Sequence, residues 1–330
     1  MRRNILNFGV IARVLISLLP ILFGMPTIAT VFCAYNLAMS FIVFGPVTAL
    51  VSALSAVCIS MLFGSSYGPM TELSGLVWGI QAILCAVGCV YAIPHDKRFF
   101  QGMCISTMGV LVPQFLHLQY VANKAGLTVA QAIVPDIEDV KTVMSATFSQ
   151  LSGEVEPEIQ AFINSGAIDE VVRIVHDTTT LLIPAVIITV SMVTAYAAMW
   201  LVSSQIRRMP VGNVHSFSHL KVSVLTSVVA LIMIPVSVIG VKTGSELLTT
   251  ATLNMLVVLL TMCYFAGISL FDFYARKFIR FTFVRVILHI IISVNVFPLY
   301  IIAAIADSFI NFRKLPVTYE KAGDKNDAEE

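Results

Sequence analysis

The stretch from Gly267 to Lys314 constrains the fold of this chain more than any other part of it. A long run of mostly apolar residues lies there between two basic ends, with His289 and Asn295 embedded in the run. A helix of roughly 20 apolar residues crosses the ~30 Å hydrocarbon core of a membrane. The stretch is therefore predicted to be a membrane segment that carries polar side chains.

Composition extends this prediction to the whole chain. Hydrophobic residues make up 58% of the 330 residues and charged residues only 12%, whereas about a quarter of the residues in a soluble domain are charged. The apolar runs suffice for about eight or nine membrane segments. We therefore expect an all-α fold, a polytopic transmembrane helical bundle with one extracytoplasmic helical loop.

The chain divides into four parts by composition. Residues 1–122 are predicted to form an N-terminal transmembrane block, residues 181–315 a C-terminal transmembrane block, and residues 316–330 a disordered cytoplasmic tail. Between the blocks, residues 123–180 contain three basic and nine acidic residues, and a shortage of Lys and Arg suits an extracytoplasmic loop. Apolar residues recur at steps of three and four from Ile137 to Leu151, which predicts an amphipathic helix, and Pro157 and Gly166 bracket a second, short one.

Basic clusters indicate the cytoplasmic side, because Lys and Arg are enriched in cytoplasmic loops. Such clusters lie near the N-terminus and at residues 95–98, 207–221, 276–285 and 313–321. A single crossing by the last block would put its two basic ends on opposite sides. Three arrangements resolve the conflict: a hairpin near Asn295–Pro298, an external C-terminus, or two proline-broken N-terminal pieces that count as one. Because proline is tolerated inside membrane helices, we expect one kinked crossing here and a miscounted segment elsewhere.

Polar side chains at membrane depth are costly and mark candidate functional sites. Seven side chains of the C-terminal block are candidate ligand or docking residues: Asp272, Arg276, Arg285, His289, Asn295, Asp307 and Arg313. Asp272 and Arg276 have the i, i+4 spacing of a helical ion pair. Two interpretations stay open, a polar cavity or docking surface on the one hand, and interface anchors with ion pairs inside the bundle on the other.

Two further sets lie in the N-terminal block. Gly75 and Gly79 have the small-xxx-small spacing that lets helices pack closely in lipid. Gln114, His117 and Gln119 are polar enough to lie at a membrane interface or at the rim of a cavity.

The sequence carries no motif that predicts catalysis, metal binding or nucleotide binding. It has no H-E-x-x-H, no Walker A run and no G-x-S-x-G nucleophile elbow. All six cysteines lie in apolar segments, and Cys85 and Cys89 share a helix face without the further ligands of a metal site. We expect a protein that is not an enzyme and that takes no metal, cofactor or nucleic acid.

The C-terminal pattern resembles a known family. The residues that carry the resemblance are Gly267, the stretch Phe271–Lys277, the loop at Phe217 and above all Ala306–Lys314, which reads ADSFINFRK. They resemble the YybS-like family of predicted bacterial multi-span membrane proteins, a domain of unknown function. The layout of two membrane blocks around one polar loop is also similar to the substrate-binding subunits of energy-coupling-factor transporters.

This resemblance implies a multi-pass protein of the bacterial inner membrane, and the basic cluster near the N-terminus places that end in the cytoplasm. The resemblance also implies a ligand among the helices, toward the outer face and under the acidic loop, with a separate coupling subunit and ATPase as partners.

Two functions from different classes follow. The first is a small-molecule-binding or transport component, which the proline-broken segments and the embedded polar residues favour. The second is a membrane scaffold or regulator of the cell envelope that transports nothing, in contact with another membrane or cytoplasmic protein. Both predict the lipid bilayer as a partner. A third hypothesis, an intramembrane enzyme, has its main support in His289.

Overall fold

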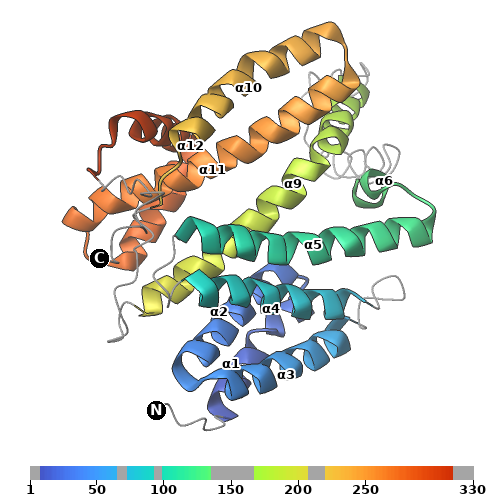
Figure 1. Cartoon of the computed structure of the whole chain (residues 1–330). Helices are drawn as coiled ribbons and strands as arrows, with labels where there is room; N and C mark the ends of the chain where they lie inside the picture. The colour runs from blue at the N-terminus through green and yellow to red at the C-terminus, as the bar shows by residue number, and fades with distance from the viewer. Residues whose placement is uncertain (1–7, 65–72, 93–98, 135–166, 207–219, 315–330) are drawn as a thin grey trace, which may run out of the picture. The chain divides into compact units, whose positions relative to one another are not determined.

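The computed structural model describes residues 8–64, 73–92, 99–134, 167–206 and 220–314, and every regular element in these ranges is a helix (Figure 1). The predicted all-α fold is therefore confirmed. The chain divides into two compact units. The first unit comprises residues 1–217 and 233–258, and the second comprises residues 218–232 and 259–330.

Prolines and glycines set the helix starts near the N-terminus. Helix α1 (Phe8–Ile16) and the short 3₁₀ helix η1 (Leu19–Phe23) precede α2 (Pro26–Phe44) and α3 (Pro46–Gly64). Pro26 and Pro46 are the first residues of their helices, where the missing N–H has no partner to lose and φ is already helical. Gly45 separates the two helices with a φ of 93°, a value that suits glycine.

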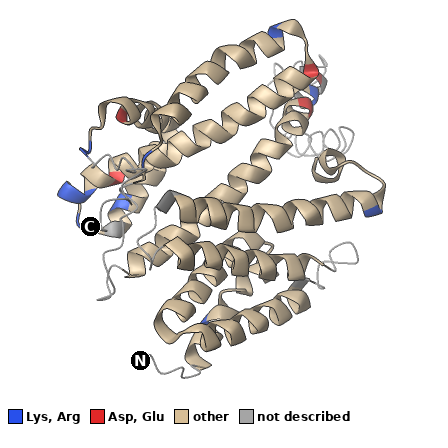
Figure 2. Cartoon of the chain, in the orientation of Figure 1, with Lys and Arg blue, Asp and Glu red and all other residues tan. Residues whose placement is uncertain are grey.

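Seven described helices are long and apolar enough to cross a membrane: α2, α3, α4 (Ser74–Ala92), α9 (Ala167–Ile206), α10 (Val224–Thr243), α11 (Glu246–Phe278) and α12 (Thr282–Ile310). Helix α5 (Phe99–Ala125) and the shorter apolar stretch Phe8–Phe23 account for the remaining predicted segments. Figure 2 shows the charged residues near helix ends, with long uncharged stretches between them. This pattern is typical of helices that lie in hydrocarbon with their ends in water.

Helix α4 packs against α2, α3 and α5 in the first unit. Glycine permits the close approach to α3, because a side chain at Gly75 would overlap the backbone oxygen of Ser60. A Cβ at Gly79 would lie only 3.0 Å from the Cα of Val57. Both glycines of the predicted small-xxx-small pair therefore lie at the α3–α4 contact, where small residues let backbones meet in lipid.

Asn254 of α11 binds α9 at the point where proline weakens that helix. Pro184 lies inside α9 and has no N–H, so the helical hydrogen-bond ladder is interrupted there. The side-chain nitrogen of Asn254 donates to the carbonyl of Leu181 at 2.8 Å, and its oxygen accepts from the N–H of Ala185 at 2.8 Å. These bonds fix the register of α11 against α9.

The first half of α12 runs antiparallel to α11 in the second unit. The hydroxyl of Tyr264 donates to the hydroxyl oxygen of Ser293 at 2.7 Å. Eight residues farther along α11, Asp272 forms an ion pair at 3.0 Å with Arg285, which lies eight residues before Ser293. Matched steps in opposite directions define an antiparallel pair.

The second half of α12 returns along the same stretch of α11. A side chain at Gly267 would overlap the backbone of Tyr300, and the hydroxyl of Tyr274 donates to the carbonyl of Phe312 at 2.9 Å. In a straight helix, Arg285 and Phe312 would be roughly 40 Å apart. Instead, they contact the same turn of α11, through Asp272 and Tyr274 respectively. The chain therefore reverses within α12.

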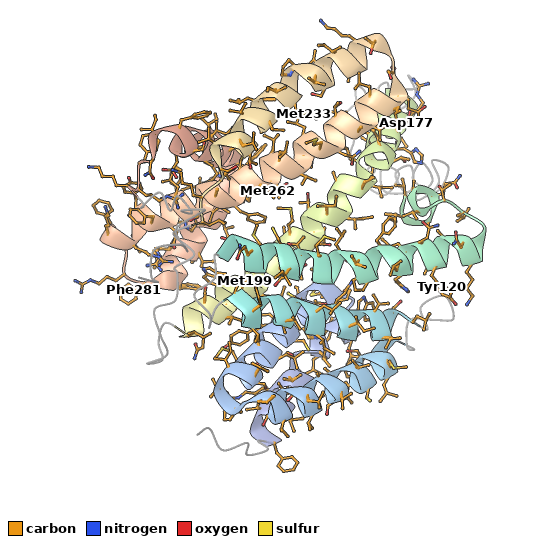
Figure 3. The ribbon with its side chains drawn as sticks, viewed as in Figure 1. Tyr120, Asp177, Met199, Met233, Met262 and Phe281 are labelled. Carbon is orange, nitrogen blue, oxygen red and sulfur yellow. The ribbon has the colours of Figure 1, made fainter. Side chains whose placement is uncertain are left out.

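The reversal occurs at Val296 and Pro298. Val296 has non-helical backbone angles, φ −141° and ψ 45°, and Pro298 cannot donate to the helical ladder. Each half of α12 is about 20 Å long, too short to cross a ~30 Å hydrocarbon core. The expected single kinked crossing is thus wrong, and the hairpin near Asn295–Pro298 is the arrangement found. The hairpin leaves both basic ends of the stretch Gly267–Lys314 at one end of α11. Figure 3 labels Phe281, which lies in the connection between α11 and α12.

The polar loop between the blocks is described only at its edges. Helix α6 (Val129–Ile133) begins with a capping box in which the side chains of Thr128 and Gln131 accept hydrogen bonds from each other's backbone N–H. Helix α9 already begins at Ala167, so residues 167–180 belong to a long helix and not to a separate loop. The helices predicted over residues 137–151 and 157–166 lie outside the described residues, as does the tail at 316–330.

Candidate functional site

A cavity of about 200 Å³ lies between α2, α4, α5 and α9 in the first unit, and we call it the polar cavity. Its polar side chains are the hydroxyls of Thr27, Thr30, Ser74 and Thr194, the amides of Gln81 and Gln114, the imidazole of His117 and the indole of Trp78. No Lys, Arg, Asp or Glu is among the described residues that line it. Uncharged hydrogen-bonding groups thus converge inside an otherwise apolar bundle.

Hydrogen bonds between α4 and α5 hold the polar side chains in place. The Ser74 hydroxyl lies 3.0 Å from Nε2 of His117, and the Gln81 amide nitrogen donates to the carbonyl of Val110 at 3.3 Å and lies 3.5 Å from Oε1 of Gln114. Nδ1 of His117 is buried and has no hydrogen-bond partner within the described ranges. Because a buried polar atom left unpaired costs about 1–3 kcal/mol, a ligand that pairs with Nδ1 would be stabilised.

The polar cavity lies near one end of the helices that form it. Pro26 and Ser74 begin α2 and α4, and His117 lies in the last third of α5. Helix α4 ends at Ala92, just before the basic residues 95–98. The cavity therefore lies at the end of α4 that is remote from this basic cluster.

Four of the seven predicted site residues meet around Asp272 in the second unit. The Nε of Arg276 donates to Oδ2 of Asp272 at 2.7 Å, and the Nε of Arg285 lies 3.0 Å from Oδ1. Nε2 of His289 lies 3.9 Å from the same Oδ1, and Nδ1 of His289 lies 2.8 Å from the hydroxyl of Tyr300. This network joins α11 to both halves of α12, so it corresponds to ion pairs within the bundle.

Asp307 and Arg313 form a second, separate pair whose side chains are both only 1% exposed. The guanidinium donates to Oδ2 of Asp307 at 2.7 and 3.1 Å, to the hydroxyl of Ser269 at 3.0 Å and to the carbonyl of Leu220 at 3.0 Å. One arginine thereby connects the end of α12 with α11 and with the chain that leads into α10.

Asn295, the last of the seven, belongs to neither cluster. Its side chain is exposed and donates to the carbonyl of Ile291 at 2.7 Å, one turn earlier in α12. The structure thus resolves the predicted set into two ion-pair clusters and one isolated amide. Among the described residues, no three His, Cys, Asp or Glu side chains form a group that could hold a metal ion.

Sequence reasoning found only part of the polar cavity. It marked Gln114 and His117 as residues of an interface or cavity rim, but it did not connect them with Ser74 or Gln81 of α4. The available signal was Gln81 itself, an amide in the middle of an apolar run. The sequence pattern does not predict that α4 packs against α5, and this packing is what brings these residues together.

Fold and site together define a multi-pass α-helical membrane protein with an uncharged polar cavity in its bundle. The chain belongs to the DUF2232 family, described as predicted membrane proteins, whose sequence profile matches residues 10–307. This match supports the predicted membrane family of unknown function, whereas the YybS-like name and the similarity to energy-coupling-factor subunits stay predictions. No curated protein and no solved structure matches the chain.

Proposed function

We propose that this protein is a small-molecule-binding component of the bacterial inner membrane, and that its ligand binds in the polar cavity. The observation that carries the proposal is the buried Nδ1 of His117, which has no hydrogen-bond partner among the described residues and belongs to a side chain that lines the polar cavity. Small-molecule sites commonly combine an apolar wall with a few convergent polar groups. Here Gln81, Gln114 and His117 supply those groups on adjacent helices.

The lining favours a ligand that carries no net charge. An ion brought into a bundle within hydrocarbon needs an opposite charge or a metal to offset its lost hydration. The described lining offers hydrogen-bond donors and acceptors but no charged side chain. A volume of about 200 Å³ suits a compact polar molecule, since drug-sized ligands occupy roughly 300–1,000 Å³.

The basic clusters support an extracytoplasmic opening for the cavity. If residues 95–98 lie in the cytoplasm, as the enrichment of Lys and Arg on that side favours, the starts of α2 and α4 lie outside. A ligand would then enter from the outer face, which agrees with the position implied by the resemblance to transporter subunits. If the protein is a transporter component of this kind, its partners would be a coupling subunit and an ATPase.

The Ser74–His117 pair also invites comparison with a catalytic dyad. A hydroxyl within 3.0 Å of an imidazole is the spacing of a nucleophile and its base. However, a catalytic histidine is oriented by a partner on its other nitrogen, and Nδ1 of His117 has none among the described residues. We therefore propose a binding role for this pair and no enzymatic activity.

Native mass spectrometry of the detergent-purified protein, with identification of any released metabolite, tests the proposal. We expect one small uncharged molecule bound to the wild type, lost in Gln114→Leu and retained in Gln119→Leu. Gln119 makes a matched control, because it is on the same helix and bonds to Asn123 at 2.9 Å instead of lining the cavity.

Two results would count against this function. A protein that stays free of ligand in several gentle detergents, and that co-purifies with another membrane protein, would favour the scaffold. Covalent labelling of Ser74 by a fluorophosphonate probe, absent in Ser74→Ala, would instead show an activated serine and overturn the non-enzymatic assignment.

A further inference from the structure

We infer that the first unit holds a second binding site, which takes a single hydrocarbon chain of lipid origin. A cavity of about 550 Å³ lies between α5, α6, α9 and the start of α11. We call it the apolar cavity. Its walls include Leu111 and Phe115 of α5 and Ile183 and Ile187 of α9, and α6 contributes Ala130.

The apolar cavity differs from the polar cavity in both position and chemistry. Along α5, Val110, Gln114 and His117 line the polar cavity, whereas Leu111 and Phe115 line the apolar one. At 100° per residue these are different faces of the helix, so α5 separates the two sites. The inference is thus independent of any ligand in the polar cavity.

The lining defines the chemical class of the occupant. Two threonine hydroxyls, Thr180 and Thr250, are the only polar side chains among the described residues that line the apolar cavity. Oγ1 of Thr180 is buried and has no hydrogen-bond partner in the described part of the chain. A fitting ligand is therefore a hydrocarbon chain with one small polar end group, such as the carboxyl group of a fatty acid, that bonds to this hydroxyl.

The volume fits one chain of a membrane lipid. If a methylene group takes the ~30 Å³ that a water molecule occupies in the liquid, then 550 Å³ holds on the order of 15–20 such groups. This is the size of one fatty acyl or short isoprenyl chain. The surrounding bilayer supplies such chains at high local concentration, and the apolar lining matches their chemistry.

Crosslinking with a photoactivatable palmitic acid, which carries a diazirine on its chain, tests the inference. The probe is added to the full-length protein in lipid nanodiscs, illuminated, and mapped by peptide mass spectrometry. We expect labels on α5 and α9 at residues such as Phe115 and Ile187, and competition by unlabelled palmitic acid. Ala130→Trp, which fills the cavity from α6, should lower this labelling on the order of tenfold.

Ala132→Trp is the matched control, because Ala132 is exposed on the same helix and does not line the cavity. Thr180→Val provides a second variant that keeps the side-chain shape, and it should weaken competition by palmitic acid while the labelled peptides stay the same. Equal thermal stability of the variants excludes misfolding as the cause.

Two outcomes would overturn the inference. Labels spread evenly over exposed helix faces, such as Ile232 and Ile239 of α10, would show contact with bulk lipid only. Labelling of α5 and α9 that resists both Ala130→Trp and excess palmitic acid would show that no chain enters the cavity.

Discussion

Replacement of Arg313 by methionine should destabilise the second unit more than replacement of an exposed neighbouring residue such as Lys314. Methionine has an unbranched apolar side chain like the aliphatic stem of arginine, but it lacks the guanidinium group. Asp307 would then retain a carboxylate that is 1% exposed and has lost its ion-pair partner. The Ser269 hydroxyl and the Leu220 carbonyl would each lose a hydrogen bond of 3.0 Å.

The size of the effect follows from these contacts. Removal of one partner from a buried ion pair costs about 3–5 kcal/mol, most of it from the charge left unpaired. Replacement of both partners by apolar residues is often neutral. We therefore expect Arg313→Met to lose about 3–5 kcal/mol of unfolding free energy and the double variant Arg313→Met/Asp307→Leu to recover most of that loss.

Reversible unfolding in mixed detergent and SDS measures these free energies, and Lys314→Met is the control because Lys314 is exposed. A loss below about 1 kcal/mol for Arg313→Met would show that the pair behaves like an exposed salt bridge. A double variant no more stable than the single one would show that the unpaired carboxylate is not the cause.

Three further predictions test the packing and the topology. Gly267→Leu should prevent the second half of α12 from docking on α11, because the new side chain would overlap the backbone of Tyr300. Limited proteolysis should then cut within α12, and an uncut chain would contradict this prediction. Asn254→Leu should lose about 1–2 kcal/mol of unfolding free energy through two interhelical hydrogen bonds, and a neutral result would mean that α9 closes its own ladder. Cysteines at Lys277 and Lys314 should react with an impermeant maleimide from the same side of the membrane, whereas labelling from opposite sides would restore a single crossing for α12.

Most of the helical architecture was predictable because it follows from hydrophobic length. Helices α2 and α3 begin at Pro26 and Pro46, and Gly45 separates them, in agreement with the preference of proline for the first position of a helix. The reversal within α12 was less accessible. Pro298 alone is compatible with a kink or a hairpin, and the choice depends on contacts such as Tyr274 with Phe312, which pattern analysis does not supply.

The candidate site was less predictable than the fold. The i, i+4 spacing of Asp272 and Arg276 predicted their ion pair, which the structure contains. The contribution of Arg285 to that network depends on the return of the chain through the α11–α12 connection. In the same way, Ser74 and His117 are 43 residues apart and meet only because α4 and α5 pack side by side. Contacts between residues of one helix could be predicted from the sequence, whereas contacts between residues of different helices could not.

The hairpin in α12 has a consequence for how the chain is made. Each basic end of the hairpin carries an arginine whose partners lie elsewhere in the second unit. Arg285 pairs with Asp272, and Arg313 donates to Ser269, so both need α11. In lipid alone these cations would be unpaired and expensive to insert. The hairpin should therefore be stable in the membrane only when it is docked on α11, which makes this docking a separate step in the assembly of the second unit.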